Sequence, residues 1–127
     1  MKGINMSMTK EELAARAVTY KHSGYNCCQA VVKTFMGDNA VLMDVASGFG
    51  MGMGCMEATC GALIGANIVL GAKGKGRCAR VLLKRFEELS GATVCNEIKG
   101  RNTGIVLASC DDCVKNAVIA LWGLLDE

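Results

Sequence analysis

Eight cysteines are the residues of this chain that could do chemistry, and they are spread along most of its length. They are Cys27, Cys28, Cys55, Cys60, Cys78, Cys95, Cys110 and Cys113. Thiolates act as nucleophiles, metal ligands and redox groups, and four of them commonly hold an iron-sulfur cluster. Because the cysteines fall on different predicted elements, only the folded chain can bring them together. The sequence therefore predicts a site that is assembled by the tertiary structure.

Cys110 and Cys113 form the one local Cys-x-x-Cys pair, at the predicted start of the last helix. Free backbone N–H groups and the helix dipole stabilise a thiolate there, whereas the carboxylates of Asp111 and Asp112 oppose it. A thioredoxin-like site would need a βαβ context, which the helical pattern does not supply. Neither ferredoxin spacing is present. Spacing alone leaves two alternatives open: a metal cluster, or a dithiol formed by two of the candidates Cys110, Cys113 and Cys60.

Other metal sites are less favoured by the residues at hand. The paired Cys-x-x-Cys pattern of zinc sites occurs once, and His22 is the single histidine. We interpret His22 as an exposed residue in the last turn of a helix, where cations are favoured, and not as a catalytic base. Met51, Met53 and Met56 beside Cys55 could bind Cu(I), but methionine more often fills irregular core space.

The composition fits a single domain covering residues 1–127. The chain has 14 Lys and Arg residues and 12 Asp and Glu residues, so its formal net charge is only +2. This charge does not indicate a basic surface that would bind nucleic acid. No apolar stretch reaches the ~18 to 20 residues of a membrane-spanning helix. The polar segment 1–10 shows no signal peptide, so a reducing cytoplasm is favoured over a secreted disulfide scaffold. We expect a cytoplasmic protein.

Helical spacing of apolar residues runs through most of the chain. Thr9 and Glu12 match a capping box at the first helix, and Ser109 can cap the last one. In the second helix, Cys27 and Cys28 point about 100 degrees apart, so they cannot face the same site. The predicted helices cover residues 9–23, 26–35, 39–46, 57–70, 78–89, 93–98 and 109 onward. We expect an all-α fold, an irregular bundle of about five to seven helices.

Glycine-rich segments are expected to make room for the site. Residues 47–55 alternate glycine with bulkier residues, but the spacing of a nucleotide-binding loop is absent, so we interpret them as a tight loop close to the site. In the helix predicted over residues 57–70, small residues recur every fourth position and include Gly61 and Gly65. Small residues permit close helix packing, which indicates that this helix is the centre of the bundle.

Four blocks in this order resemble the C_GCAxxG_C_C family of redox-active proteins: GYNCCQAV, GFGMGMGCMEATCGALIG, VCNEIKG and CDDCVKNA. The resemblance runs from about Gly24 into the last helix. It implies that the family's four cysteines correspond to Cys27, Cys60, Cys95 and Cys110. Cys113 lies close enough to compete for the fourth position. The remaining cysteines are extras, either further ligands or buried thiols that behave as small apolar residues: Cys28, Cys55 and Cys78.

The resemblance implies a redox role, with relatives associated with anaerobic electron transfer and with a domain of split-Soret cytochromes that is linked to a non-haem iron-sulfur centre. We therefore expect an iron-sulfur cluster, of a type left open, that serves electron transfer or redox sensing together with a partner electron-transfer protein. The expected ligands are Cys27, Cys60, Cys95 and Cys110, with Cys113, Cys55 and Cys28 in reserve. Haem is not expected, because no Cys-x-x-Cys-His motif occurs.

Two alternatives to a cluster protein stay open. The first is a metal-free dithiol oxidoreductase, in which two of the same cysteines alternate between thiols and a disulfide. The second is a zinc-stabilised or purely structural helical interaction module. An electron carrier is favoured over a stand-alone enzyme, and the oligomeric state is open, with a homodimer as one possibility.

Overall fold

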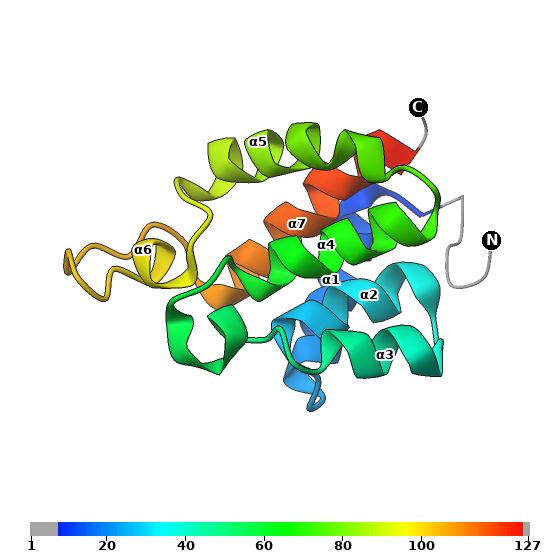
Figure 1. Cartoon of the computed structure of the whole chain (residues 1–127), viewed down its shortest axis with the longest axis horizontal. Helices are drawn as coiled ribbons and strands as arrows, with labels where there is room; N and C mark the ends of the chain where they lie inside the picture. Colours follow the sequence, from blue (N-terminus) through cyan, green and yellow to red (C-terminus); the bar gives the residue numbers. More distant parts are fainter. Residues whose placement is uncertain (1–7, 126–127) are drawn as a thin grey trace.

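The computed structural model describes residues 8–125, which form an all-α fold (Figure 1). Its helices are α1 (Lys10–His22), α2 (Cys27–Met36), α3 (Ala40–Ala46), α4 (Gly61–Ala72), α5 (Ala79–Ser90), α6 (Cys95–Lys99) and α7 (Cys110–Leu125). A π-helical turn, η1 (Gly52–Met56), precedes α4, and a 3-10 turn, η2 (Gly76–Cys78), precedes α5. The predicted all-α class is confirmed. The β pairing within the described residues is one isolated bridge, between Thr59 and Val94.

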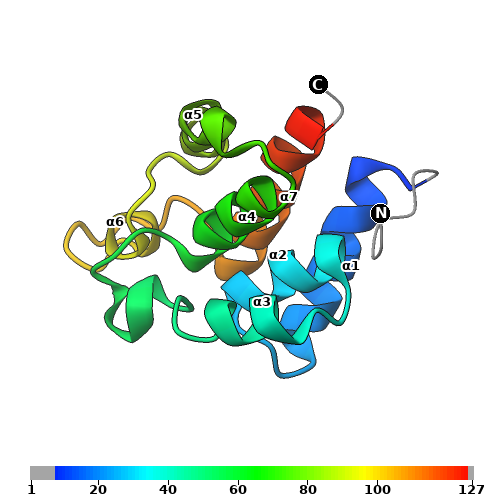
Figure 2. The same ribbon diagram turned by 45° about the vertical axis from the view of Figure 1, so that its right-hand side comes forward.

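Four helices surround the core in a closed ring, in which α1 packs on α2, α2 on α4, α4 on α7 and α7 on α1. Figure 2 shows α4 in the middle of the molecule, with α5 on its outer side and α3 against α2. Every described α-helix contributes to the hydrophobic core, which includes Leu13, Phe35, Leu70, Phe86 and Leu121. None of the helices in residues 8–125 is long and apolar enough to cross a membrane.

Side-chain caps determine where several helices begin. The predicted capping box at Thr9 is present. A second box opens α2, where Asn26 and Gln29 each accept a hydrogen bond from the other's backbone N–H, at 2.7 and 3.1 Å. Ser109 Oγ accepts from the backbone N–H of Asp112 at 3.0 Å, as predicted. These caps satisfy N–H groups that a helix start leaves free, and two of them precede cysteines.

Two glycines of α4 allow other segments to approach its backbone closely, and one of these segments is the backbone of α2. A Cβ on Gly65 would lie 2.6 Å from the carbonyl oxygen of Cys28. A Cβ on Gly61 would lie 2.5 Å from the carbonyl oxygen of Phe49 and 2.6 Å from Cys27 Sγ. No side chain fits at these distances, so both positions need glycine. The helix with small residues at every fourth position, α4, is therefore at the centre of the bundle, as predicted.

The predicted start of this helix at residue 57 is wrong, because α4 begins later. Residues 58–60 are extended and pair with residues 93–95. The backbone N–H groups of Cys60 and Cys95 donate to carbonyls of the opposite segment, at 2.8 and 3.0 Å. A distant segment supplies these partners, which local periodicity cannot reveal. The bridge places Cys60 beside Cys95.

The predicted glycine-rich loop contains a turn, η1, that the sequence did not indicate. The backbone is left-handed at Met53 and Met56 of this turn and at Met51, just before it, with φ of 61, 66 and 53 degrees. This conformation is unfavourable for residues with a side chain, so other contacts must hold it. One such contact is the hydrogen bond from Arg101 Nη1 to the carbonyl oxygen of Cys55, at 3.1 Å.

Gly65→Ala is expected to lower the free energy of unfolding by roughly 1–3 kcal/mol, because the added methyl group would overlap the carbonyl of Cys28. Gly71→Ala is a matched control in α4 with open space around it, and it should raise the free energy of unfolding by ~0.5–1 kcal/mol. Urea unfolding followed by Trp122 fluorescence measures both. Equal stabilisation in the two variants would contradict a backbone contact at Gly65.

Candidate functional site

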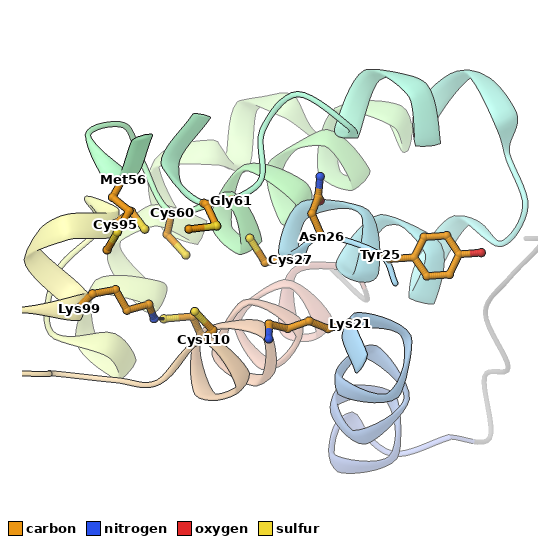
Figure 3. A pocket seen from close by; sticks show the side chains of 12 residues that line it. Lys21, Tyr25, Asn26, Cys27, Met56, Cys60, Gly61, Cys95, Lys99 and Cys110 are labelled. Carbon is orange, nitrogen blue, oxygen red and sulfur yellow. Dashed lines mark hydrogen bonds between the residues drawn. The ribbon is translucent and has the colours of Figure 1, made fainter. Parts of the chain in front are cut away.

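A cavity of about 300 Å³ lies at one end of the helix ring, and five cysteines line it (Figure 3). They are Cys27, Cys60, Cys95, Cys110 and Cys113. These are the four cysteines expected from the family pattern and the one that competes for the fourth position. The fold thus brings together residues that are far apart in the sequence. Their role as ligands stays a prediction.

Four of these cysteines lie where helices begin. Cys27, Cys95 and Cys110 are the first residues of α2, α6 and α7, and Cys60 is the N-cap of α4. Cys113 follows in the first turn of α7. In the three longer helices, α2, α4 and α7, the free N–H groups and the dipole favour negative charge at this end. The cavity is therefore suited to thiolates.

Cys60 and Cys113 form a hydrogen-bonded pair of buried side chains. The hydrogen bond from Cys60 lowers the pKa of Cys113 to about 6; burial opposes this effect, and the positive charge of Lys99 supports it. The same hydrogen bond, together with burial, raises the pKa of Cys60. The hydrogen bond and the positive charge of Lys99 therefore favour ionisation of Cys113 over that of Cys60.

Two lysines line the cavity beside the cysteines. Lys99 Nζ donates to Cys113 Sγ at 3.4 Å and to the carbonyl oxygen of Ala108 at 3.1 Å. Cys95, four residues before Lys99 in α6, is buried; burial raises the pKa of its thiol, and the Lys99 charge opposes that rise. Cys110 is exposed at the edge of the cavity. The site thus extends from a buried pair to the protein surface.

Asp111 does not oppose the thiolates as strongly as its position next to Cys110 indicated. Its carboxylate lies 3.3 Å from Lys21 Nζ and 2.9 Å from His22 Nε2. The hydrogen bond from His22, with a smaller contribution from Lys21, lowers the pKa of Asp111. His22 is exposed in the last turn of α1, as predicted. His22 therefore lies outside the cavity lining, as a partner of Asp111.

Three cysteines do not line the cavity. Cys28 is fully buried in the core, and burial, with a smaller effect of Cys27, raises its pKa to about 12. Cys78 packs against the core, partly buried. Cys55 is exposed on η1, where its thiol donates to the carbonyl oxygen of Gly52 at 3.6 Å. Of the three reserve ligands, the structure brings Cys113 to the cavity and leaves Cys28 and Cys55 outside it.

Some residues that line the cavity were missed in the sequence. Lys99 stands four residues after Cys95, a spacing that puts both on one face of a helix and could have pointed to it. Met51 and Met56 also line the cavity. The interpretation of these methionines as core filling is wrong, because η1 and the residue before it place them against the site. No sequence pattern marks Lys21, which reaches the cavity from the end of α1.

Within residues 8–125, no group of three or more His, Cys, Asp or Glu side chains is placed to hold a single metal ion. A preformed zinc site is therefore not supported. A cluster inserts its own iron and sulfide atoms between the ligand sulfurs, so thiols that bind it stand apart around a cavity. The cavity is lined by at least the four thiols that such a group commonly needs.

The fold and the site define a class: a small all-α protein whose cysteines gather at helix starts, beside cations, in a setting suited to redox chemistry. The model of the C_GCAxxG_C_C family, described as "Putative redox-active protein", matches residues 25–122, and the chain belongs to this family. The match includes all five cysteines of the cavity. A search of curated proteins and a search of solved structures gave no match.

Cys60→Ala is expected to raise the pKa of Cys113 above about 6 in the reduced, metal-free protein, because the donated hydrogen bond is lost. Cys60→Ser retains a hydroxyl donor and should raise the pKa less. The ultraviolet absorbance of thiolate, measured against pH with Cys113→Ala as the blank, gives the midpoint. The prediction fails if Cys113 titrates at the same pH in Cys60→Ala as in the unchanged protein.

Proposed function

We propose that this protein binds an iron-sulfur cluster in the cysteine-lined cavity and serves electron transfer or redox sensing. The observation that carries the proposal is the gathering of Cys27, Cys60, Cys95 and Cys110 around one cavity, from the starts of four different helices. Membership of a family of redox-active proteins supports it. A function that used only one buried pair of cysteines would leave the other three thiols of the cavity without a role.

Each part of the site has a role in this proposal. Cys27, Cys60, Cys95 and Cys110 would hold the cluster, which would supply one-electron chemistry. The starts of α2, α4 and α7 would offset the negative charge of the thiolates. Met51 and Met56 would limit the access of water, which influences the reduction potential.

A partner electron-transfer protein and a reducing cytoplasm belong to the same proposal. Cys110 is exposed while it lines the cavity, so it would link the buried sulfurs to a docked partner. Free thiols are kept reduced in the cytoplasm by the cell's thiol systems.

The pair formed by Cys60 and Cys113 favours a second candidate, a metal-free dithiol oxidoreductase. The Cys113 thiolate would attack a substrate disulfide, form a mixed disulfide and release one substrate thiolate. Cys60 would then attack Cys113 Sγ, lose its proton and release the second substrate thiolate. The substrate disulfide is reduced, and the protein is left with a disulfide between Cys60 and Cys113.

Protein purified under strict anaerobiosis is expected to contain stoichiometric iron and acid-labile sulfide and to show charge-transfer absorption. Cys60→Ser should lose all three, because it removes a thiol from the cavity wall. Cys55→Ser is the matched control, since Cys55 lies outside the cavity, and it should retain all three. Iron and sulfide assays with an absorption spectrum provide the measurement.

The fourth ligand is decided by the same assays on two further variants. Cys110→Ser should lose the cluster and Cys113→Ser should keep it; the reverse would assign the fourth position to Cys113. A wild-type protein that stays free of iron and sulfide after reconstitution would rule out the cluster proposal.

In the second candidate, metal-free protein treated with a small disulfide reagent should form the Cys60–Cys113 disulfide. Peptide mass spectrometry identifies the bridge. Cys113→Ser should abolish both the bridge and the release of reagent thiol, whereas Cys55→Ser should leave them unchanged. A bridge between Cys110 and Cys113 would show that the local Cys-x-x-Cys pair is the reactive one instead.

A further inference from the structure

Lys99 is a cation that reaches directly into the cysteine site. Its ammonium group donates to Cys113 Sγ at 3.4 Å, and the side chain is half-buried. Figure 3 shows this side chain extending across the cavity toward α7. Cys95 and Lys99 share one face of α6, so the short helix contributes both a thiol and a cation to the same space.

The charge of Lys99 is not neutralised by a carboxylate in the part of the chain that the structure describes. Lys21, the other lysine of the cavity, lies 3.3 Å from Asp111 and is paired. Burial lowers the pKa of Lys99, but the charges of Cys113 and Cys110 outweigh burial and keep the pKa above its ordinary value. An ammonium group without a carboxylate partner therefore faces the sulfurs at neutral pH.

We propose that Lys99 is a positioning residue that raises the reduction potential of the cysteine site. The proposal rests on the redox function proposed above. Reduction adds negative charge to the site, and a fixed cation hydrogen-bonded to sulfur stabilises the reduced state more than the oxidised one. The effect is stronger for a half-buried charge than for one in water, because screening is weaker.

The sign of the effect is the same for both candidate functions. In a cluster protein, Lys99 offsets the charge gained by the cluster and its thiolate ligands. In a dithiol protein, two electrons and one proton convert the disulfide into the Cys60 thiol and the Cys113 thiolate, and Lys99 stabilises this thiolate, which exists only in the reduced form. Removal of the ammonium group makes reduction less favourable in either case.

A purely structural role for Lys99 makes a different prediction. The ammonium group also donates to the carbonyl oxygen of Ala108, just before α7, and this contact could hold the helix start in place. Lys99→Arg keeps the charge with a different shape, whereas Lys99→Met keeps a similar length without charge. A structural role would make both variants alike, and an electrostatic role separates them.

The test is the midpoint reduction potential of the anaerobic protein, measured for the wild type and three variants. Lys99→Met should lower the equilibrium constant for reduction by about tenfold, ~59 mV for a one-electron couple. Lys99→Arg should stay close to the wild type. Lys84→Met removes the same charge from an exposed site on α5, where solvent screens it, and should also stay close to the wild type.

A wild-type potential in Lys99→Met, or an equal shift in Lys99→Arg and Lys99→Met, would overturn the proposal. If iron and sulfide are absent, the cluster proposal fails, and the Cys60–Cys113 couple is equilibrated in a glutathione redox buffer instead. Lys99→Met should again have the lower potential, and equal potentials or the absence of any couple would overturn the role of Lys99. Circular dichroism checks folding, and Lys99→Gln replaces Lys99→Met if the latter does not fold.

Discussion

The site depends on the backbone contact between α2 and α4. A glycine inside a helix is about 1 kcal/mol less favourable than alanine, yet α4 carries Gly65 where α2 crosses it and Gly61 where Cys27 reaches it. At Gly65 the crossing brings the helix backbones together, and at Gly61 the space that a Cβ would fill is taken by Cys27 Sγ and the Phe49 carbonyl. This proximity puts the first residue of α2 beside the N-cap of α4, which gives the cavity two of its sulfurs.

Gathering thiols at such close range creates an electrostatic problem, because ionised sulfurs repel one another and are poorly solvated when buried. Three features of the structure offset this repulsion and poor solvation. Three long helices begin at the cavity and direct free N–H groups to it. Lys99 supplies a charge, and Cys60 donates a hydrogen bond to Cys113. Each of these features favours a reduced, negatively charged site. The fold therefore suits the redox chemistry of a cluster as well as that of a dithiol.

Local pattern predicts what depends on neighbours in the sequence. The caps at Thr9 and Ser109 follow from local capping residues, and the all-α class and the different directions of Cys27 and Cys28 follow from helical spacing; the structure agrees. The start of α4, the left-handed turn η1 and the approach of Lys99 to α7 depend on contacts between distant segments. Periodicity contains no information on such contacts, so these features needed the fold.

The Cys-x-x-Cys pair shows why a local motif can mislead. Cys110 and Cys113 lie in one helix turn, but one is exposed and the other is buried against Cys60. The close partner of Cys113 is thus a residue from another helix, far away in the sequence. Cys60 is also the N-cap of α4, beside the glycine that admits Cys27, and its backbone is paired with the segment that carries Cys95. Cys60 is therefore linked in the fold to three of the other cavity cysteines, Cys27, Cys95 and Cys113.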